Sequence, residues 1–408
     1  MRHRIASLLL WAIALGTLLL NPNAASLAAE QPDASAAADA ANAFAWDMFG
    51  QLRQEAGNLF FSPYSIHAAL AMTSAGARSH TAEEMRDTLR LGGLPNDVHP
   101  ALGALRSAVE ADKDAPYELA VANALWGQAG FGFHNAFLDA LERHYGAGLK
   151  RVDFEADPDG SRERVNAWVA EKTRDRIRDI LPRSAVTRDT RLALANAIYF
   201  KGDWAEQFDE ERTEEAPFHR APGDEAEAPF MRQRRRFPYA ETDSLQALAL
   251  PYAGDGLEMV VLLPKEKDGL TGVEEALDSE ELDGLFRRRR SAEVEVWLPR
   301  FTMTRQYSLK PTLEALGMRT AFTARADFTG ISGDAPLKID AAVHKAFVEV
   351  NEEGTEAAAA TAVSIGIVSI TVPTEPVVFR ADRPFLFLVR HVPTGAILFM
   401  GRVADPTM

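Results

Sequence analysis

Residues 351–370 read Asn351-Glu-Glu-Gly-Thr-Glu-Ala-Ala-Ala-Ala-Thr-Ala-Val-Ser-Ile-Gly-Ile-Val-Ser-Ile370, and this segment decides the fold. Side chains of a β-strand alternate between two faces, so every second residue from Thr355 would share one face. All of these residues are small or apolar and none is charged: Thr355, Ala357, Ala359, Thr361, Val363, Ile365 and Ile367. The segment therefore fits a sheet interior, yet a charged turn precedes it and Pro373 and Pro376 follow it, which is typical of an exposed loop. A segment that suits both places predicts a conformational switch.

Four further motifs occur in a fixed order along the chain. They are Asn58-Leu-Phe-Phe-Ser-Pro-Tyr-Ser-Ile66, Leu194-Ala-Asn-Ala-Ile-Tyr-Phe-Lys-Gly-Asp-Trp204, Pro336-Leu-Lys-Ile-Asp-Ala-Ala-Val-His-Lys-Ala346 and Arg380-Ala-Asp-Arg-Pro-Phe-Leu-Phe-Leu388. Together with residues 351–361, these motifs resemble the serpin family. The resemblance implies a serpin fold, with an exposed reactive centre loop over about residues 352–376, and suicide inhibition of serine or cysteine proteases.

The coarse order of elements favours an α+β protein. Helical spacing of apolar residues predicts helices over residues 43–52, 65–75, 134–145, 159–180 and 308–316, and Thr81-Ala-Glu-Glu84 has the form of a capping box for a further helix. Apolar runs predict strands over residues 119–126, 191–200, 245–250, 257–263, 292–298, 343–350, 377–379, 385–389 and 397–403. Because helices come early and strands late, without regular alternation, mixed or mostly antiparallel sheets are expected. The serpin resemblance implies about eight or nine helices.

Length and composition predict one large exported domain. The chain has 408 residues, of which 47% are apolar, and no linker or repeat follows residue 40, so residues 29–408 are predicted to form a single serpin domain after a frayed lead-in over residues 29–40. Residues 1–28 have a basic start, one apolar run, and Ser26 and Ala28 at a signal peptidase spacing, which predicts a signal peptide. An uncleaved N-terminal anchor is the alternative. The expected location is extracellular or periplasmic.

The net charge limits the expected binding partners, and the cysteine content excludes disulfide bonds. The formal charge is −15, and removal of residues 1–28 takes away Arg2 and Arg4 and makes it −17. An acidic surface repels nucleic acid and anionic membranes, so neither is an expected partner. There is no cysteine, so no disulfide supports the exported protein.

By the serpin resemblance, the loop begins with a hinge and carries the bond that the protease cuts. The hinge would let the cleaved loop enter the main sheet, and its residues are Glu352, Gly354, Thr355, Glu356, Ala357, Ala358, Ala359, Ala360 and Thr361. The family's spacing, counted forward from Gly354, places the reactive bond at Val368–Ser369, with Ile365, Gly366, Ile367 and Ile370 in the neighbouring subsites. Counting back from Pro384 instead ends near Pro373, because the loop is longer than usual. The forward count is preferred, since the sheet fixes the length of the inserting strand.

The resemblance also implies two control points in the main sheet. Ser62, Ser65, Asn196 and His344 match a polar cluster, called the shutter, beneath the centre of the sheet, where it acts as a hydrogen-bonded latch. Trp204 and Arg300 match the breach at the top of the sheet, with Arg300 expected to form an exposed ion pair with Glu352. Without the resemblance, these would be unrelated residues, and His344 a buried structural histidine.

The other motifs in the sequence predict no polyanion, metal, catalytic or cofactor site. Arg287–Arg290 and the run of Arg232, Arg234, Arg235 and Arg236 fit a solvated turn better than a polyanion site, because acidic residues flank the first run. Residues 107–114 are not basic, which argues against activation by heparin-type ligands. No metal-binding, nucleophile-elbow or phosphate-loop motif occurs, so neither an enzyme nor a cofactor is expected.

The sequence therefore predicts a bacterial-type, secreted and monomeric serpin. It would trap an elastase-like or subtilisin-like serine protease, or a cysteine protease, in a covalent complex. The first alternative is a non-inhibitory serpin with a carrier, chaperone or storage role. The second is an exported hydrolase or solute-binding protein, for which no polar pocket is visible in the sequence.

Overall fold

Strand β4 (Leu192–Asp203) is apolar on both faces, and the two hydrophobic clusters of the protein meet on it. The computed structural model describes residues 33–110, 116–355 and 375–408. Leu194, Ile198 and Phe200 join the larger cluster, whereas Ala193, Ala195 and Ala197 join the smaller one. A strand that is buried on both sides needs a nearly continuous apolar sequence, which explains the run from Leu192 to Phe200.

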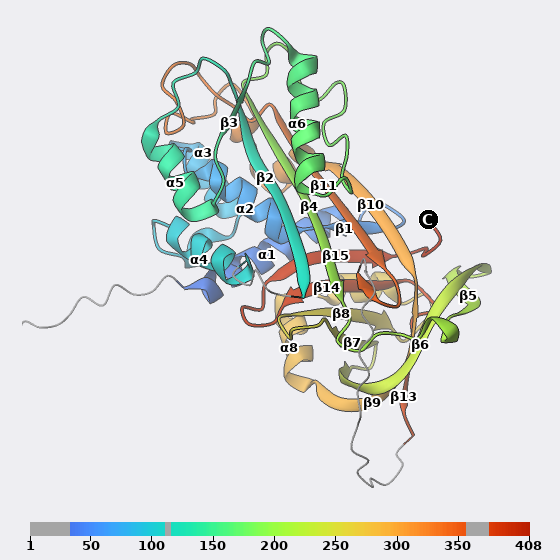
Figure 1. Ribbon diagram of the computed structural model, residues 1–408. Coiled ribbons are helices and arrows are strands. Elements are labelled where there is room, and N and C mark those ends of the chain that lie inside the picture. Colours follow the sequence, from blue (N-terminus) through green and yellow to red (C-terminus); the bar gives the residue numbers. More distant parts are fainter. Residues whose placement is uncertain (1–32, 111–115, 356–374) are drawn as a thin grey trace, which may run out of the picture. The chain divides into compact units, whose positions relative to one another are not determined.

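β4 belongs to a six-stranded sheet with the order β10-β11-β12-β4-β2-β3. Its other strands are β2 (Tyr117–Gln128), β3 (Lys150–Val152), β10 (Phe301–Ser308), β11 (Ala341–Val350) and β12 (Gly354–Thr355). β2 is antiparallel to β4, whereas β11 is parallel to it, so the sheet is mixed. In Figure 1, β2, β4, β11 and β10 run side by side as its long strands.

The second sheet has nine strands, with the path β1-β15-β14-β8-β7-β6-β9-β13 and with β5 paired to β6. Its strands are β1 (Leu59–Phe61), β5 (Glu214–Ala221), β6 (Asp224–Glu241), β7 (Leu245–Pro251), β8 (Leu257–Pro264), β9 (Arg290–Pro299), β13 (Val377–Arg380), β14 (Phe385–His391) and β15 (Ile397–Val403).

Nine α-helices are present among the described residues. They are α1 (Ala34–Leu52), α2 (Pro63–Ser74), α3 (Ser79–Thr88), α4 (His99–Glu110), α5 (Asn135–Tyr145), α6 (Pro158–Lys172), α7 (Leu270–Ala276), α8 (Ser279–Arg288) and α9 (Leu309–Ala315). α2 contacts β2 and β4 of one sheet and β15 of the other, whereas α6 covers the opposite face of β2 (Figure 1). The six-stranded sheet is therefore packed between α2 and α6.

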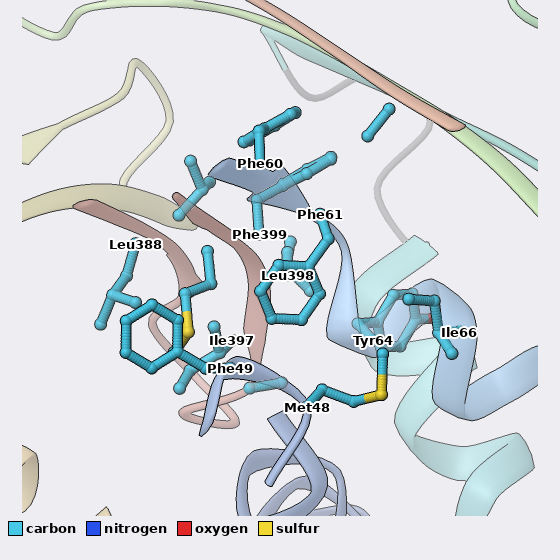
Figure 2. Close-up of a cluster of buried hydrophobic side chains, with 14 of the residues drawn as sticks. Met48, Phe49, Phe60, Phe61, Tyr64, Ile66, Leu388, Ile397, Leu398 and Phe399 are labelled. Atoms are coloured by element: carbon cyan, nitrogen blue, oxygen red, sulfur yellow. The ribbon is translucent and has the colours of Figure 1, made fainter. Parts of the chain in front are cut away.

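Aromatic rings of the nine-stranded sheet pack together in a core beside α1. Phe60 stacks on Phe399 and Phe387, with ring centroids 5.4 and 5.8 Å apart. Figure 2 shows Phe60 and Phe399 together with Met48 and Phe49 of α1. These side chains are at most 1% exposed, so this region is a fully packed core.

Three helix predictions are wrong at their boundaries. α1 begins at Ala34, within the predicted frayed lead-in, because alanine is the best helix former and Ala37, Ala38 and Ala41 are buried. α3 begins at Ser79, and Thr81 is not its cap but a buried residue whose hydroxyl accepts a hydrogen bond from Asp327 N at 2.9 Å.

The helix predicted to end at residue 180 ends at Lys172. Arg174 and Asp175 adopt positive φ values of 49° and 63°, which no helix continues. Ile177 and Ile180 nevertheless reach the smaller cluster from the following loop.

The arginine run at 232–236 is not a turn. It lies within the long strand β6, where Arg232 pairs with Glu295 and Arg234 with Glu293 across the sheet, at 2.7 and 2.9 Å. The described residues from Asp33 to Met408 form one compact unit, and no helix in this described part combines the length and apolarity needed to cross a bilayer.

Candidate functional site

A two-residue strand enters the six-stranded sheet between β4 and β11. Thr355 of β12 pairs with Val350 of β11 on one side and with Gly202 of β4 on the other, in antiparallel register. Beyond this point β4 and β11 pair directly, in a parallel ladder from Ala193–Ala341 to Tyr199–Phe347. We call this ladder the seam. The chain that leads into the loop therefore already starts a strand at one end of the seam.

A tight turn at residues 351–354 directs the chain toward the seam. The Asn351 side-chain oxygen accepts hydrogen bonds from the backbone N–H groups of Glu353 and Gly354, at 3.1 and 3.2 Å, and Asn351 N donates to Gly354 O at 2.9 Å. Gly354 is required for steric reasons, because a Cβ atom there would lie 2.1 Å from the carbonyl oxygen of Gly202.

Glu352 holds this turn to the neighbouring sheet. Its carboxylate accepts hydrogen bonds from Arg300 Nε at 2.6 Å and from the Thr213 hydroxyl, and Arg300 Nη2 lies 2.5 Å from the same carboxylate as an ion pair. The expected pair between Glu352 and Arg300 is present, but it is not an exposed pair: the Glu352 side chain is 3% exposed and that of Arg300 is 41% exposed. Loss of Arg300 would therefore leave a buried carboxylate with one remaining side-chain donor.

Trp204 and Tyr252 form the wall beside the turn. Trp204 donates from Nε1 to Asn351 O at 3.0 Å and from its backbone N to Glu353 O at 2.8 Å. The Tyr252 ring stacks on Trp204 with centroids 4.6 Å apart, and its hydroxyl bonds to Thr355 Oγ1 at 2.7 Å. Burial raises the pKa of Tyr252, so its hydroxyl stays protonated. Tyr252 was not predicted as a site residue, because it lies in none of the five sequence motifs.

Below the seam, five side chains form what we call the polar cluster: Ser62, Ser65, Asn123, Asn196 and His344. Asn123, Asn196 and His344 lie opposite one another on β2, β4 and β11, so they form a row across three strands. Ser62 is the N-cap of α2, and Ser65 lies in its first turn. All but Asn123 are 0% exposed.

Hydrogen bonds across the polar cluster close the seam. His344 Nδ1 bonds to Asn196 Oδ1, and Ser62 N donates to His344 Nε2 at 3.1 Å, so the imidazole is neutral and protonated on Nδ1. Asn196 Nδ2 donates to Ser65 O and Ser65 Oγ at 2.9 and 2.8 Å. Burial lowers the pKa of His344 to about 3, so the neutral form persists at physiological pH.

Ser62 extends these bonds to the other sheet. Its hydroxyl donates to Leu398 O of β15 at 2.6 Å and accepts from Ser65 N at 3.1 Å. Asn123 was missed by the sequence analysis, although its amide bonds to Ser65 O at 3.2 Å and its oxygen accepts from Ser65 Oγ at 3.0 Å. A lone asparagine in an apolar strand, as at 196, is the signal that could have identified it.

The remaining predicted loop residues lie outside the described residues. They are the hinge residues Glu356, Ala357, Ala358, Ala359, Ala360 and Thr361, the subsite residues Ile365, Gly366, Ile367 and Ile370, and the reactive bond Val368–Ser369. The description resumes at Glu375, shortly before β13, which pairs in parallel with β9. Residues 1–28 are also outside it.

Comparisons with known proteins show which family this chain belongs to. The family model described as Serpin (serine protease inhibitor) matches residues 39–406. The chain belongs to the serpin family. A leukocyte elastase inhibitor of Bos taurus is 41% identical over 373 residues, which cover 89% of this chain and 97% of that protein.

Two solved serpin structures are also similar to the whole described fold. Uncleaved ovalbumin has a TM-score of 0.82 at 32% identity, covering 92% of this chain and 100% of that one. A loop-inserted structure of a cleaved ovalbumin mutant has a TM-score of 0.81 at 30% identity, covering 91% and 100%. The predicted α+β serpin fold is confirmed, and membership of a family of serine protease inhibitors implies a target protease as partner.

Proposed function

We propose that this serpin inhibits an elastase-like or subtilisin-like serine protease by inserting its cleaved reactive centre loop into the seam between β4 and β11. One observation carries the proposal: Thr355 is already paired with both strands at the end of the seam. A cleaved loop would continue this strand between β4 and β11, which beyond it pair directly with each other at the seam in the described part of the chain.

The register of Thr355 defines what each following residue would meet. Continued in antiparallel register, Ala357 would lie between Phe200 and Val348, and Ala359 between Ile198 and Ala346. Residues 357, 359, 361, 363 and 365 would then face the larger hydrophobic cluster, to which Phe200, Ile198 and Val348 belong. This is the charge-free series in the sequence, so insertion would bury no ionised group on that face.

The same register would bring Thr361 between Asn196 and His344. Insertion must break the His344–Asn196 hydrogen bond that closes the seam. The Thr361 hydroxyl both donates and accepts, so it can replace the lost partner on either strand. The polar cluster would thus hold the seam closed and then receive the inserted strand without leaving an unpaired polar group.

The length of the seam supports the forward count for the reactive bond. The parallel ladder ends at Ala193 and Ala341, which would lie opposite Ser364 in the extended register. Val368 follows a few residues later, so an enzyme attached there would reach the far end of the sheet. The small apolar side chain of Val368 suits a protease with a small apolar primary pocket.

The proposed chemistry uses the catalytic residues of the protease. Its serine oxygen attacks the Val368 carbonyl carbon, the bond to Ser369 breaks, and the Ser369 nitrogen leaves as an amine after accepting a proton. Val368 is then held as an ester, and insertion carries the attached protease away before water can release it. Distortion of the displaced protease would prevent hydrolysis of the ester.

Insertion would be strongly favourable once the loop is cut. Parting the seam breaks one parallel ladder of seven residue pairs, whereas the inserted strand forms two antiparallel ladders. The net gain is on the order of ten backbone hydrogen bonds, each worth ~0.5–1.5 kcal/mol. The uncut protein is therefore proposed to be metastable.

The test is incubation of the protein with an elastase-like protease, with subtilisin and with trypsin. We expect an SDS-stable complex with at least one of the first two and none with trypsin, and mass spectrometry should place the cut at Val368–Ser369. The matched variant Val368→Arg should transfer complex formation to trypsin. Cleavage without a complex would reject inhibition, and a cut outside residues 366–371 would reject the assignment of the bond.

The proposal includes export of a monomeric protein after removal of residues 1–28, to the periplasm or the medium. It rests on the basic start and apolar run of that segment. N-terminal sequencing of the protein recovered from each compartment tests it. A mature chain that retains residues 1–28 would contradict it.

A further inference from the structure

A cavity of about 430 Å³ lies between β2 and the helices α2, α4, α5 and α6, and Asn123 of the polar cluster is part of its lining. Its size is that of a small-molecule site. Ala68, Met72, Val109, Leu119 and Val121 supply an apolar part of its lining. Some polar groups around the cavity have hydrogen-bond partners within the protein and others have none. A buried polar group without a partner indicates a ligand.

The Tyr64 hydroxyl has no hydrogen-bond partner among the described residues, although Tyr64 lines this cavity and is only 3% exposed. Buried hydroxyl groups in proteins are nearly always paired. Burial raises the pKa of Tyr64, and Glu110 raises it further against the opposing effect of Arg106, so the group remains a donor at neutral pH. A buried donor that lines a cavity needs an acceptor from outside the chain.

Tyr145 lines the same cavity and provides the contrast. Its hydroxyl bonds to His99 Nδ1 at 2.7 Å, so its hydrogen-bonding capacity is used within the protein. Of these two tyrosines, Tyr64 is the one whose hydroxyl has no partner among the described residues and can bond a ligand.

Among the described residues that line the cavity, Arg106, Lys150 and Lys172 are basic and Glu110 is acidic. Arg106 is paired with Glu110 at 2.9 Å and also donates to His144 O at 3.1 Å, so these two charges balance. Lys172 lies 3.5 Å from the exposed Glu171. Lys150 has no ion pair with any acidic side chain in the described ranges, and its Nζ lies 5.1 Å from the centroid of the Trp168 ring. The lining therefore favours an anion.

We propose that this cavity binds a small amphipathic organic carboxylate. The apolar body packs against the lining from Met72, Val109 and Val121. One carboxylate oxygen accepts the hydrogen bond of the Tyr64 hydroxyl, and the positive charge of Lys150 balances the ligand charge. The site is separate from the strand-entry turn, so it does not depend on the proposed inhibition.

Calorimetric titration of the full chain with 2-naphthoate tests the proposal, with neutral 2-naphthamide as the uncharged analogue. We expect saturable binding of the acid at one site and at least about tenfold weaker binding of the amide. Tyr64→Phe should weaken binding of the acid at least about tenfold, because a hydrogen bond to a charged acceptor is lost. Lys150→Gln should weaken binding of the acid but not of the amide.

Thermal unfolding without ligand supplies the second readout. Tyr64→Phe removes an unpaired hydroxyl, so it should leave the melting temperature unchanged or raise it. Tyr145→Phe removes a paired hydroxyl, so it should lower the melting temperature but retain 2-naphthoate binding. Absence of binding, or a lowered melting temperature in Tyr64→Phe, would overturn the proposal.

Discussion

The seam and the core of the nine-stranded sheet both lie in the interior, but their side chains differ. Along the seam, alanine occupies positions 193, 195 and 197 of β4 and positions 341, 342 and 346 of β11. In the nine-stranded sheet, β14 and β8 pair Phe387 with Val261 and Leu388 with Val260, and Phe387 also packs on Phe60. Five of the seven residue pairs of the seam contain an alanine and one pairs His344 with Asn196, whereas large apolar groups face one another in the second region.

This difference explains how one protein can contain one sheet whose strands separate and another whose strands stay paired. Separating large core side chains costs 2–5 kcal/mol for each group removed from its contacts, whereas an alanine has little to lose. Hydrogen bonds such as that between His344 and Asn196 can be exchanged for new ones with an incoming strand. The predictions below test this contrast.

The largest expected effect comes from blocking the seam. Ala359→Arg should lower the yield of SDS-stable protease complex by more than about tenfold, because insertion would bury an unpaired guanidinium between Ile198 and Ala346. Cleavage of the loop should continue, since Val368 is unchanged. Gel densitometry at fixed protease concentration measures both products.

The matched control is Val378→Arg, at a side chain of β13 that is 55% exposed. It adds the same group outside the seam and should leave the complex yield unchanged. Full yield in Ala359→Arg would show that the loop does not enter between β4 and β11.

Next in size is the steric requirement at the entrance of the seam. Gly354→Ala would place a Cβ atom 2.1 Å from the Gly202 carbonyl oxygen, so the free energy of unfolding should fall by roughly 1–3 kcal/mol. Gly50→Ala is the control, because Gly50 lies in α1 with no atom near the added group, and it should raise stability by roughly 0.5–1 kcal/mol. Urea denaturation compares the two, and equal effects would contradict the tight fit at Gly354.

The sequence was sufficient for the fold family and for most of the site, because the relevant motifs are local. Residues 351–355 contain the turn, its glycine and the first strand residue. Part of their contacts form within the turn or with Trp204 and Arg300, two residues that the serpin resemblance also indicates. Site residues that lie far from the motifs in the sequence were harder to predict. Asn123 reaches the site through strand register and Tyr252 through an isolated β-bridge to Trp204, and a single sequence encodes neither contact locally.

Element boundaries failed where tertiary contacts outweigh local pattern. α1 extends to Ala34 because its alanines pack closely against the core, although their low complexity predicted fraying. The arginines of β6 looked like a solvated turn, but glutamates on β9 face them across the strands and balance their charge. In both cases the deciding contact lies far away in the sequence.

A smaller effect is the pH dependence of stability that His344 of the seam contributes, with the buried His67 of α2 as the comparison. Burial lowers the pKa of His344 at the seam to about 3 and that of His67 in α2 to about 4, both below the unfolded value of 6.5. The unfolded chain therefore binds more protons below pH 6.5, so stability is fully present above that pH and is lost as the pH falls toward these values. Each histidine contributes a slope of ~1.4 kcal/mol per pH unit.

Unfolding free energies of the wild type, His344→Gln and His67→Gln between pH 7.5 and 5 measure these slopes. Each substitution should remove its own share of the pH dependence. If the His67 change alone flattened the curve, His344 would not be held neutral by the seam.

The smallest expected effect is that of the ion pair at the turn. Arg300→Ala should cost about 1 kcal/mol, because Glu352 is buried but the guanidinium is partly exposed and water can take its place. Arg234→Ala breaks a more exposed pair with Glu293 and should cost less than ~0.5 kcal/mol. Glu352→Gln combined with Arg300→Ala in a double-mutant cycle isolates the pair. A cost for Arg300→Ala no larger than that for Arg234→Ala would mean that uncharged hydrogen bonds, such as those of Asn351 and Trp204, hold the turn, and that the entrance to the seam needs no ion pair to stay in register.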